Sequence, residues 1–371
     1  MKMTIGFFLS AFLCLVACGG NNGATPPDAP VEFSFSPAQL TMPPGDNSAR
    51  ITVTANAEWS VSSDKTWCDY LPYMGYPGET TVKITTAINY TGHPRVATLA
   101  FHAGATTQPY TVTQEGEETG VETPDGYVLV WRDEFDAPRS PNGARALPDA
   151  DKWSYETGDH GWGNNELQNY IPAVAGADTC AALHDGVLKI TLRKRGNQTL
   201  SVRMNTRHSW LYGYFEARLK LPGGRGTWPA FWMLPENFNT WPDDGEIDIM
   251  EEVGYDPDII LSTIHCKAYN HGANTQKSGS RHVPGAEANF HVYAVEWTPD
   301  VIRGLVDGEC YFEFPNDKRG SKDTWPFNAP FYLKLNLAWG GNWGGAQGVD
   351  ESALPAVYEI DYVRVFQKQT D

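Results

Sequence analysis

Apolar and polar residues alternate in short runs along most of this chain, as at residues 49–55 and 81–85. Clusters of glycine, proline and asparagine interrupt the runs, and no segment keeps a helical period for long. Similar runs follow at residues 127–131, 187–192, 213–221, 291–297, 331–337 and 358–365. Because side chains on a strand point alternately to two faces, this pattern predicts many half-buried strands. We therefore expect an all-β protein.

Two β regions are separated by residues 117–126, an acidic segment with proline and glycine that indicates a linker. Residues 31–116 are short enough for a small immunoglobulin-like β-sandwich. Residues 127–371 form a much longer series of strands without intervening helices, which favours one large sandwich or jelly roll.

The first residues are typical of a targeting segment. Lys2 precedes an apolar run that is too short for a membrane span and suits a signal peptide, residues 1–17. Its Leu-x-Ala-Cys ending resembles a bacterial lipobox, which implies cleavage before Cys18 and lipid on the Cys18 sulfur. The alternative is an ordinary secretory signal that contains a cysteine. With residues 18–30 as a linker, we expect a cell-envelope lipoprotein of the outer membrane, at the cell surface or the periplasmic face.

Composition narrows the choice of partner. The formal net charge of -17 disfavours nucleic acid and anionic membrane surfaces, but a neutral polymer is indifferent to it. We expect a monomer that meets the membrane only through its lipid. Beyond Cys14 and Cys18, the cysteines have no metal-binding spacing. Buried free thiols are favoured, and one disulfide among the last three stays possible; the remaining cysteines are Cys68, Cys180, Cys266 and Cys310.

The chemistry is expected at the acidic motif of residues 245–251. Glu246 and Asp248 share a face of a strand at a spacing of about 6.6 Å. Strict alternation would send Glu251 to the other face, and a β-bulge near residues 249–250 returns it. Close carboxyls raise one another's pKa, and glycoside hydrolysis uses such a pair, one ionised and one protonated. A solvated acidic strand or a calcium site is the simpler alternative.

Residues 127–368 resemble glycoside hydrolase family 16, most closely its laminarinase-like β-glucanases. The resemblance is carried by residues 131–136, 161–170, 212–218, 227–235, 246–251, 290–298 and 336–343. It implies a β-jelly roll and a retaining double displacement that needs no cofactor. Glu246 would be the nucleophile, Glu251 the general acid/base, and Asp248 would hold the pair's geometry and protonation. Neighbouring Glu252 is expected on the opposite face.

Substrate contacts are expected from aromatic rings, which stack on the apolar faces of sugars, and from polar groups around them. The candidates are Asn164, Arg203, Trp228, Trp232, Trp241, His265 and Trp343. Asn164 and Arg203 rest on the family resemblance, and His265 on its place in the strand after the acidic motif. Trp131, Trp153 and Trp297 are assigned to the core.

The family resemblance also implies a structural calcium away from the cleft. Its ligands would be the backbone carbonyls of Glu134 and Gly186 and the carboxylate of Asp361. The alternative is that Asp361 simply forms a salt bridge.

The N-terminal β region resembles a BACON domain through residues 57–61, Trp67, 95–99 and 112–116. Such a domain could bind glycan or mucin, or act as a spacer. Trp59 and Trp67 suit a core as well as a binding platform, so we favour the spacer.

We thus expect an endo-β-glucanase that hydrolyses β-1,3-glucan, mixed-linkage β-1,3/1,4-glucan or both. Two alternatives remain: a family 16 hydrolase of the agar or carrageenan type, and a non-catalytic surface glycan-binding protein. The negative charge argues against sulfated substrates, and a dead fold has no need to keep three clustered carboxyls.

Overall fold

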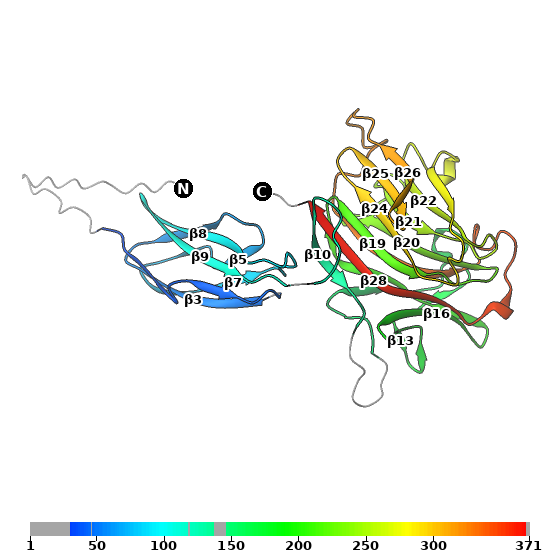
Figure 1. Cartoon of the computed structure of the whole chain (residues 1–371), viewed down its shortest axis with the longest axis horizontal. Coiled ribbons are helices and arrows are strands. Elements are labelled where there is room, and N and C mark those ends of the chain that lie inside the picture. Colours follow the sequence, from blue (N-terminus) through cyan, green and yellow to red (C-terminus); the bar gives the residue numbers. More distant parts are fainter. Residues whose placement is uncertain (1–29, 46, 118, 137–145, 369–371) are drawn as a thin grey trace, which may run out of the picture. The chain divides into compact units, whose positions relative to one another are not determined.

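The computed structural model describes residues 30–45, 47–117, 119–136 and 146–368. The expected signal peptide, the lipidation at Cys18 and nearly all of the linker at 18–30 lie outside these residues. In the described residues the regular structure is β-strand except for three 3-10 turns (Figure 1), so the all-β prediction is confirmed. The turns are η1 (Gly161–Gly163), η2 (His271–Ala273) and η3 (Glu351–Ala353). In this part of the chain, none of the helices has the length and hydropathy of a membrane span.

The chain divides into two compact units, and the second contains all residues from Thr113 onward. The N-terminal region is a sandwich of two sheets, with strand orders β1-β3-β7-β5 and β2-β9-β8-β4-β6. Its strands are β1 (Phe33–Ser36), β2 (Leu40–Met42), β3 (Asn47–Ala55), β4 (Trp59–Ser63), β5 (Cys68–Leu71), β6 (Met74–Gly75), β7 (Gly78–Thr86), β8 (Arg95–Ala103) and β9 (Thr106–Gln114). Trp59 is buried and packs against Phe101, with ring centroids 5.2 Å apart, so it belongs to the core of this sandwich.

A ten-stranded and a seven-stranded sheet build the second unit. The larger sheet contains β10 (Tyr127–Asp133), β12 (Asn169–Tyr170), β15 (Ala181–His184), β16 (Val187–Arg195), β17 (Gln198–Ser201), β19 (Gly213–Lys220), β24 (His291–Trp297), β25 (Val301–Val306), β26 (Glu309–Pro315) and β28 (Ala356–Lys368). The smaller has the order β11-β18-β27-β20-β21-β22-β23. Its strands are β11 (Trp153–Glu156), β18 (Arg203–Trp210), β20 (Thr227–Pro235), β21 (Glu246–Glu251), β22 (Ile259–His265), β23 (Lys277–His282) and β27 (Phe331–Trp339). A short ribbon pairs β13 (Val174–Ala175) with β14 (Asp178–Thr179).

The core lies between these two sheets, because one hydrophobic cluster contains residues of both. In β19, buried and half-buried positions alternate, so Phe215 and Ala217 face the core. Strand β27 differs, since it is buried along almost its whole length. Leu333, Leu335 and Leu337 belong to the core, while the even positions between them lie on the other face of the sheet. Because β27 is buried on both faces, side chains must also cover its second face. These side chains belong to the functional site.

Candidate active site

The strand that carries the acidic motif has the expected bulge. On its β20 side, Asp248 pairs with Trp232 and Met250 with Phe231, so Ile249 has no partner. On its β22 side, the pairing moves from Asp248↔Thr263 to Glu251↔Leu261. This extra residue in β21 returns Glu251 to the face of Glu246 and Asp248.

Both residues of the bulge are buried in the core, which anchors the distortion. Ile249 and Met250 are each fully buried in the cluster between the sheets. On β22, Ser262 donates a hydrogen bond to the Asp248 carbonyl at 2.8 Å, next to the irregular step. The bulge is therefore held by apolar packing in the core and by a cross-strand hydrogen bond from β22.

Cross-strand register explains which side chains share the open face of the sheet. Lys334 of β27 lies between Asn205 of β18 and Trp232 of β20, and Trp232 lies beside Asp248. The next cross-strand row on the same face of the sheet contains Arg203, Asn336, Ala230 and Glu251. Cationic and amide groups thus stand on β18 and β27, and carboxyls stand on β21.

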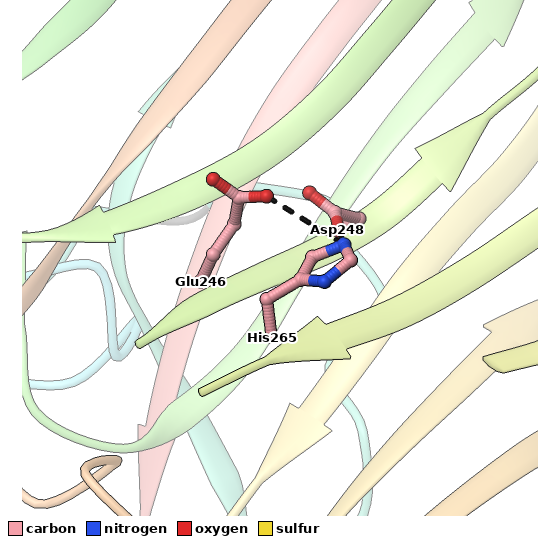
Figure 2. A group of neighbouring side chains, drawn as sticks. All are labelled: Glu246, Asp248 and His265. Atoms are coloured by element: carbon pink, nitrogen blue, oxygen red, sulfur yellow. Dashed lines mark ion pairs between the residues drawn. The ribbon is translucent and has the colours of Figure 1, made fainter. Parts of the chain in front are cut away.

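The carboxyls meet a histidine from the neighbouring strand (Figure 2). His265 Nε2 lies 3.3 Å from Asp248 Oδ2 and 3.8 Å from Glu246 Oε1. Asp248 and His265 are buried, and Asp248 Oδ2 has no hydrogen-bond partner among the described residues. Glu251 Oε1 instead accepts a hydrogen bond from Trp228 Nε1 at 2.9 Å. His265 is therefore the polar neighbour of the carboxyl cluster as well as a residue of the cleft wall.

Burial dominates the electrostatics of the three carboxyls. It raises the pKa of Glu246, Asp248 and Glu251 to about 8 each, and repulsion from Asp248 adds to the effect on both glutamates. At Glu246, His265 and Arg203 oppose the rise. At Glu251, the Trp228 hydrogen bond and His265 oppose it, whereas Glu166 adds to it. Arginine charge thus favours the ionised form of Glu246 in particular.

All ten residues predicted for catalysis and substrate contact line one cleft of about 660 Å³ on this face. They are Asn164, Arg203, Trp228, Trp232, Trp241, Glu246, Asp248, Glu251, His265 and Trp343. Trp228 meets Trp343 edge to face at 5.4 Å between centroids. Both Trp228 and Trp232 therefore belong to the cleft, which settles the choice between cleft and core that their spacing left open.

The structure adds cleft residues that the sequence reasoning did not single out, among them Trp162, Glu166, His271 and Asn336. A signal existed for three of them, because they fall within sequence blocks 161–170 and 336–343 that carry the family resemblance. Glu166 accepts hydrogen bonds from Gln168 and Tyr170, and burial raises its pKa. His271 had no such signal: it stands on η2, 4.6 Å from Trp241 between ring centroids.

The three predicted calcium ligands lie away from the cleft. Asp361 accepts a hydrogen bond from Arg218 at 2.6 Å, as the simpler alternative supposed, and the Glu134 side chain pairs with Arg364. Gly186 has a positive φ of 75° in the turn before β16. Their neighbours in the chain pair with the middle of β28, where Asp133 lies opposite Val363 and Leu188 lies opposite Ile360. Register thus brings the three positions together beside the middle of β28, where β10 ends and β16 begins.

The tryptophans assigned to the core, Glu252 and the cysteines lie outside the cleft. Trp153 and Trp297 are fully buried, and Trp131 packs partly buried against the same core. Glu252 is buried away from the cleft, as expected. Cys180 and Cys266 are buried free thiols, but Cys310 is exposed, because it lies near the start of β26, the edge strand of the larger sheet. The prediction of burial was therefore wrong for that cysteine.

A cleft that combines paired carboxyls with aromatic rings and amides has the groups that a glycosidase needs. Comparison with known proteins agrees. Residues 168–364 match Glycosyl hydrolases family 16, and residues 57–115 match BACON, described as a putative N-terminal binding domain. The chain belongs to glycosyl hydrolases family 16.

Its relatives are similar over about two thirds of the chain. A beta-glucanase of Rhodothermus marinus is 50% identical over 254 residues, which cover 65% of this chain and 85% of the relative. The laminarinase structure from Rhodothermus marinus has a TM-score of 0.61 at 48% identity and covers 66% of this chain and 98% of its own. The structure of SCLam, a non-specific endo-beta-1,3(4)-glucanase, has a TM-score of 0.61 at 44% identity. It covers 67% of this chain and 94% of its own.

Proposed function

We propose that this chain is a retaining endo-β-glucanase that hydrolyses β-1,3-glucan, mixed-linkage β-1,3/1,4-glucan or both. The observation that carries the proposal is the bulge in β21, which places Glu246, Asp248 and Glu251 together in a cleft lined by tryptophans. The relatives named as a beta-glucanase and as an endo-beta-1,3(4)-glucanase support the choice of substrate.

Glu246 acts as the nucleophile and Glu251 as the general acid/base. Glu251 gives its proton to the glycosidic oxygen while the Glu246 carboxylate attacks the anomeric carbon, so the glycosidic bond breaks as a glycosyl ester forms. Glu251 then removes a proton from water, which attacks the same carbon and releases Glu246. The charges around the cluster support this assignment of roles, since Arg203 favours an ionised Glu246 and Glu166 favours a protonated Glu251.

Asp248 stands between the two glutamates and acts through them. Its side chain lies beside His265, and its negative charge raises the pKa of both neighbours. When Asp248 is protonated it can donate a hydrogen bond to a carboxylate, and when it is ionised it disfavours a second charge. It therefore couples the proton of one glutamate to the charge of the other.

The tryptophans and amides hold the sugar chain over this cluster. Trp228, Trp232, Trp241 and Trp343 offer rings for the apolar faces of the sugars, with Asn164, Arg203 and His265 as polar partners. The test is a product profile on laminarin, cereal mixed-linkage glucan, agarose and xyloglucan, with Glu246→Gln as control. We expect β-glucan oligosaccharides from the first two. Cleavage of agarose alone would favour the agar-type alternative, and glucan binding without cleavage would favour a binding protein.

A structural calcium at Glu134, Gly186 and Asp361 remains part of the proposal. Carbonyl and carboxylate oxygens suit calcium, and register brings these positions together. Close by, a Cβ on Gly186 would lie 3.1 Å from Asp136 Oδ1, so a further carboxylate is near. The ion would stabilise the fold and take no part in the chemistry. We expect EDTA to lower the Tm and added calcium to restore it, and an unchanged Tm would contradict the site.

The expected location is likewise proposed. The lipobox-like ending at Cys18 supports a lipoprotein held at the outer membrane, at the cell surface or the periplasmic face, and we expect it to be a monomer. Cys18→Ala should move the protein from the membrane fraction to the soluble fraction, and protease treatment of intact cells should distinguish the two faces. Membrane association that survives the substitution would contradict a lipid anchor on Cys18.

A further inference from the structure

A lysine is fully buried beneath the cleft and is not used by the mechanism above. Lys334 stands on β27 in the same cross-strand row as Trp232 and Asp248, yet none of its surface is exposed and it does not line the cleft. Lysine is rarely buried completely unless its charge is paired. An even position of β27 on the cleft side could have held an apolar residue, as position 338 holds Ala338.

The contacts of Lys334 are specific. Its Nζ donates to Glu156 Oε1 at 2.9 Å and to Asn205 Oδ1 at 2.7 Å. It also lies 4.9 Å from the centre of the Trp232 ring and 5.1 Å from that of Tyr332. The ammonium is thus fixed by two oxygens and covered by two aromatic rings, an arrangement that favours a cation.

The same network reaches the cleft surface. The other oxygen of Glu156 accepts a hydrogen bond from Arg203, whose guanidinium lies 4.6 Å from the centre of the Trp162 ring and 4.8 Å from that of Trp232. Trp232 is held in addition by Asn336, which accepts from its Nε1 at 2.7 Å. One carboxylate therefore ties a buried lysine to an arginine of the cleft, and both cations contact the ring of Trp232, which also lines the cleft.

We propose that Lys334 is a positioning residue for the hydrolytic reaction: from beneath the cleft it holds Arg203 and Trp232 in place and supplies positive charge that favours the ionised form of Glu246. With Arg203 and Glu156 it leaves one net positive charge on the β18–β27 side of a cluster of three carboxyls. The inference rests on the proposed function and adds Lys334 to Arg203 as a cation that favours the ionised nucleophile.

The surroundings of Glu246 are consistent with this role. The charged or titratable groups around Glu246 are Asp248 and Glu251 on its own strand, His265 on β22, Arg203 on β18 and Lys334 on β27, with His271 of η2 next to His265. Burial lowers the pKa of Lys334 to about 7, with Arg203 acting in the same direction, while Glu156 and Glu246 favour the charged lysine. Lys334 and Glu246 thus favour each other's charged form.

The test compares two variants by the pH dependence of kcat/KM on laminarin. Lys334→Met keeps the length of the side chain but removes its charge, and Asn205→Asp keeps the lysine and cancels its field with a new carboxylate. Loss of positive charge raises the pKa of a carboxyl, so the acidic limb should move to higher pH in both variants. We expect the pKa of the acidic limb to rise by about half a pH unit or more. This corresponds to about threefold lower kcat/KM on that limb.

Asn205→Ala serves as the control, because it removes a hydrogen bond to Lys334 without changing the charge. Its acidic limb should stay in place, and the Tm of each variant shows whether the fold is retained. If Lys334→Met does not fold, Asn205→Asp still carries the test. An acidic limb that stays in place in the folded variants, even with reduced kcat, would overturn the inference. Failure of the wild type to cleave any β-glucan would instead overturn the proposed function.

Discussion

Two adjacent glutamates at the end of β21 occupy opposite sides of the same sheet. Glu251 faces the cleft, where Trp228 donates a hydrogen bond to it. Glu252 is fully buried and accepts a hydrogen bond from the Asp258 backbone N–H at 2.8 Å. Burial raises the pKa of both carboxyls to about 8. A raised pKa therefore does not by itself identify a catalytic acid.

The difference lies in what each carboxyl can reach. Glu251 shares its cleft with Glu246 and Asp248, so its proton can move to a bound substrate. Glu252 is near Tyr293 and Tyr358, whose hydroxyls have no hydrogen-bond partner among the described residues. Burying a carboxyl lowers stability on either face of the sheet. On the cleft side the raised pKa serves a reaction, whereas on the side of Glu252, here called the sealed side, burial only reduces stability.

The largest expected effect comes from the cleft side. Glu246→Gln removes the nucleophile, and kcat on laminarin should fall by about 10⁴-fold or more, as losses of covalent nucleophiles do. The matched control is Glu252→Gln, the same chemical change on the sealed side, which should leave kcat near that of the wild type. Equal losses in both variants would contradict the distinction between the two sides. Reducing-sugar release measures both.

Glu251→Ala should have the next largest effect, a fall in kcat/KM of about 10²- to 10⁴-fold, the contribution of a general acid. The loss should be smaller on aryl glycosides, whose leaving groups need no proton. Azide should restore turnover and give a β-glycosyl azide, because it attacks the covalent intermediate. With Glu246→Ala, azide should give the α-glycosyl azide instead. The opposite pattern of products would exchange the two roles.

The sequence predicted the strands and the carboxyl cluster because both follow from local rules. Alternation fixed which side chains share a face, and the departure from alternation at Glu251 required a bulge, which the structure contains. The network of Lys334, Glu156 and Arg203 had no comparable signal. It joins β27, β11 and β18, whose residues are far apart in sequence, and only the register across the sheet brings them together. His271 likewise reaches the cleft through a loop.

A smaller effect is expected from the hydrogen bond that marks the cleft side. Trp228→Phe keeps an aromatic ring but removes the donor to Glu251 Oε1. A hydrogen bond to a carboxylate favours its ionised form, so its loss should raise the pKa of Glu251. The alkaline limb of kcat/KM should then move to higher pH, with kcat/KM at the optimum reduced less than in the Glu251 variant. A limb that stays in place would show that the bond does not act on the acid, and a limb that moves to lower pH would show that it favours the protonated form.

The smallest effect on activity is expected for Glu252→Gln. This variant should instead gain stability at alkaline pH. An unfolded glutamate titrates near pH 4.3, whereas burial raises the pKa of Glu252 to about 8 in the folded protein. Between these values the folded state keeps a proton that the unfolded state releases, so stability falls as the pH rises through this window. Glutamine stays neutral and can still accept from the Asp258 N–H. The variant should therefore have a higher Tm than the wild type at pH 8 and an equal Tm near pH 4, as measured by calorimetry. A gain at both pH values would point to packing, and a loss at pH 8 would mean that the charged carboxylate stabilises the sealed side.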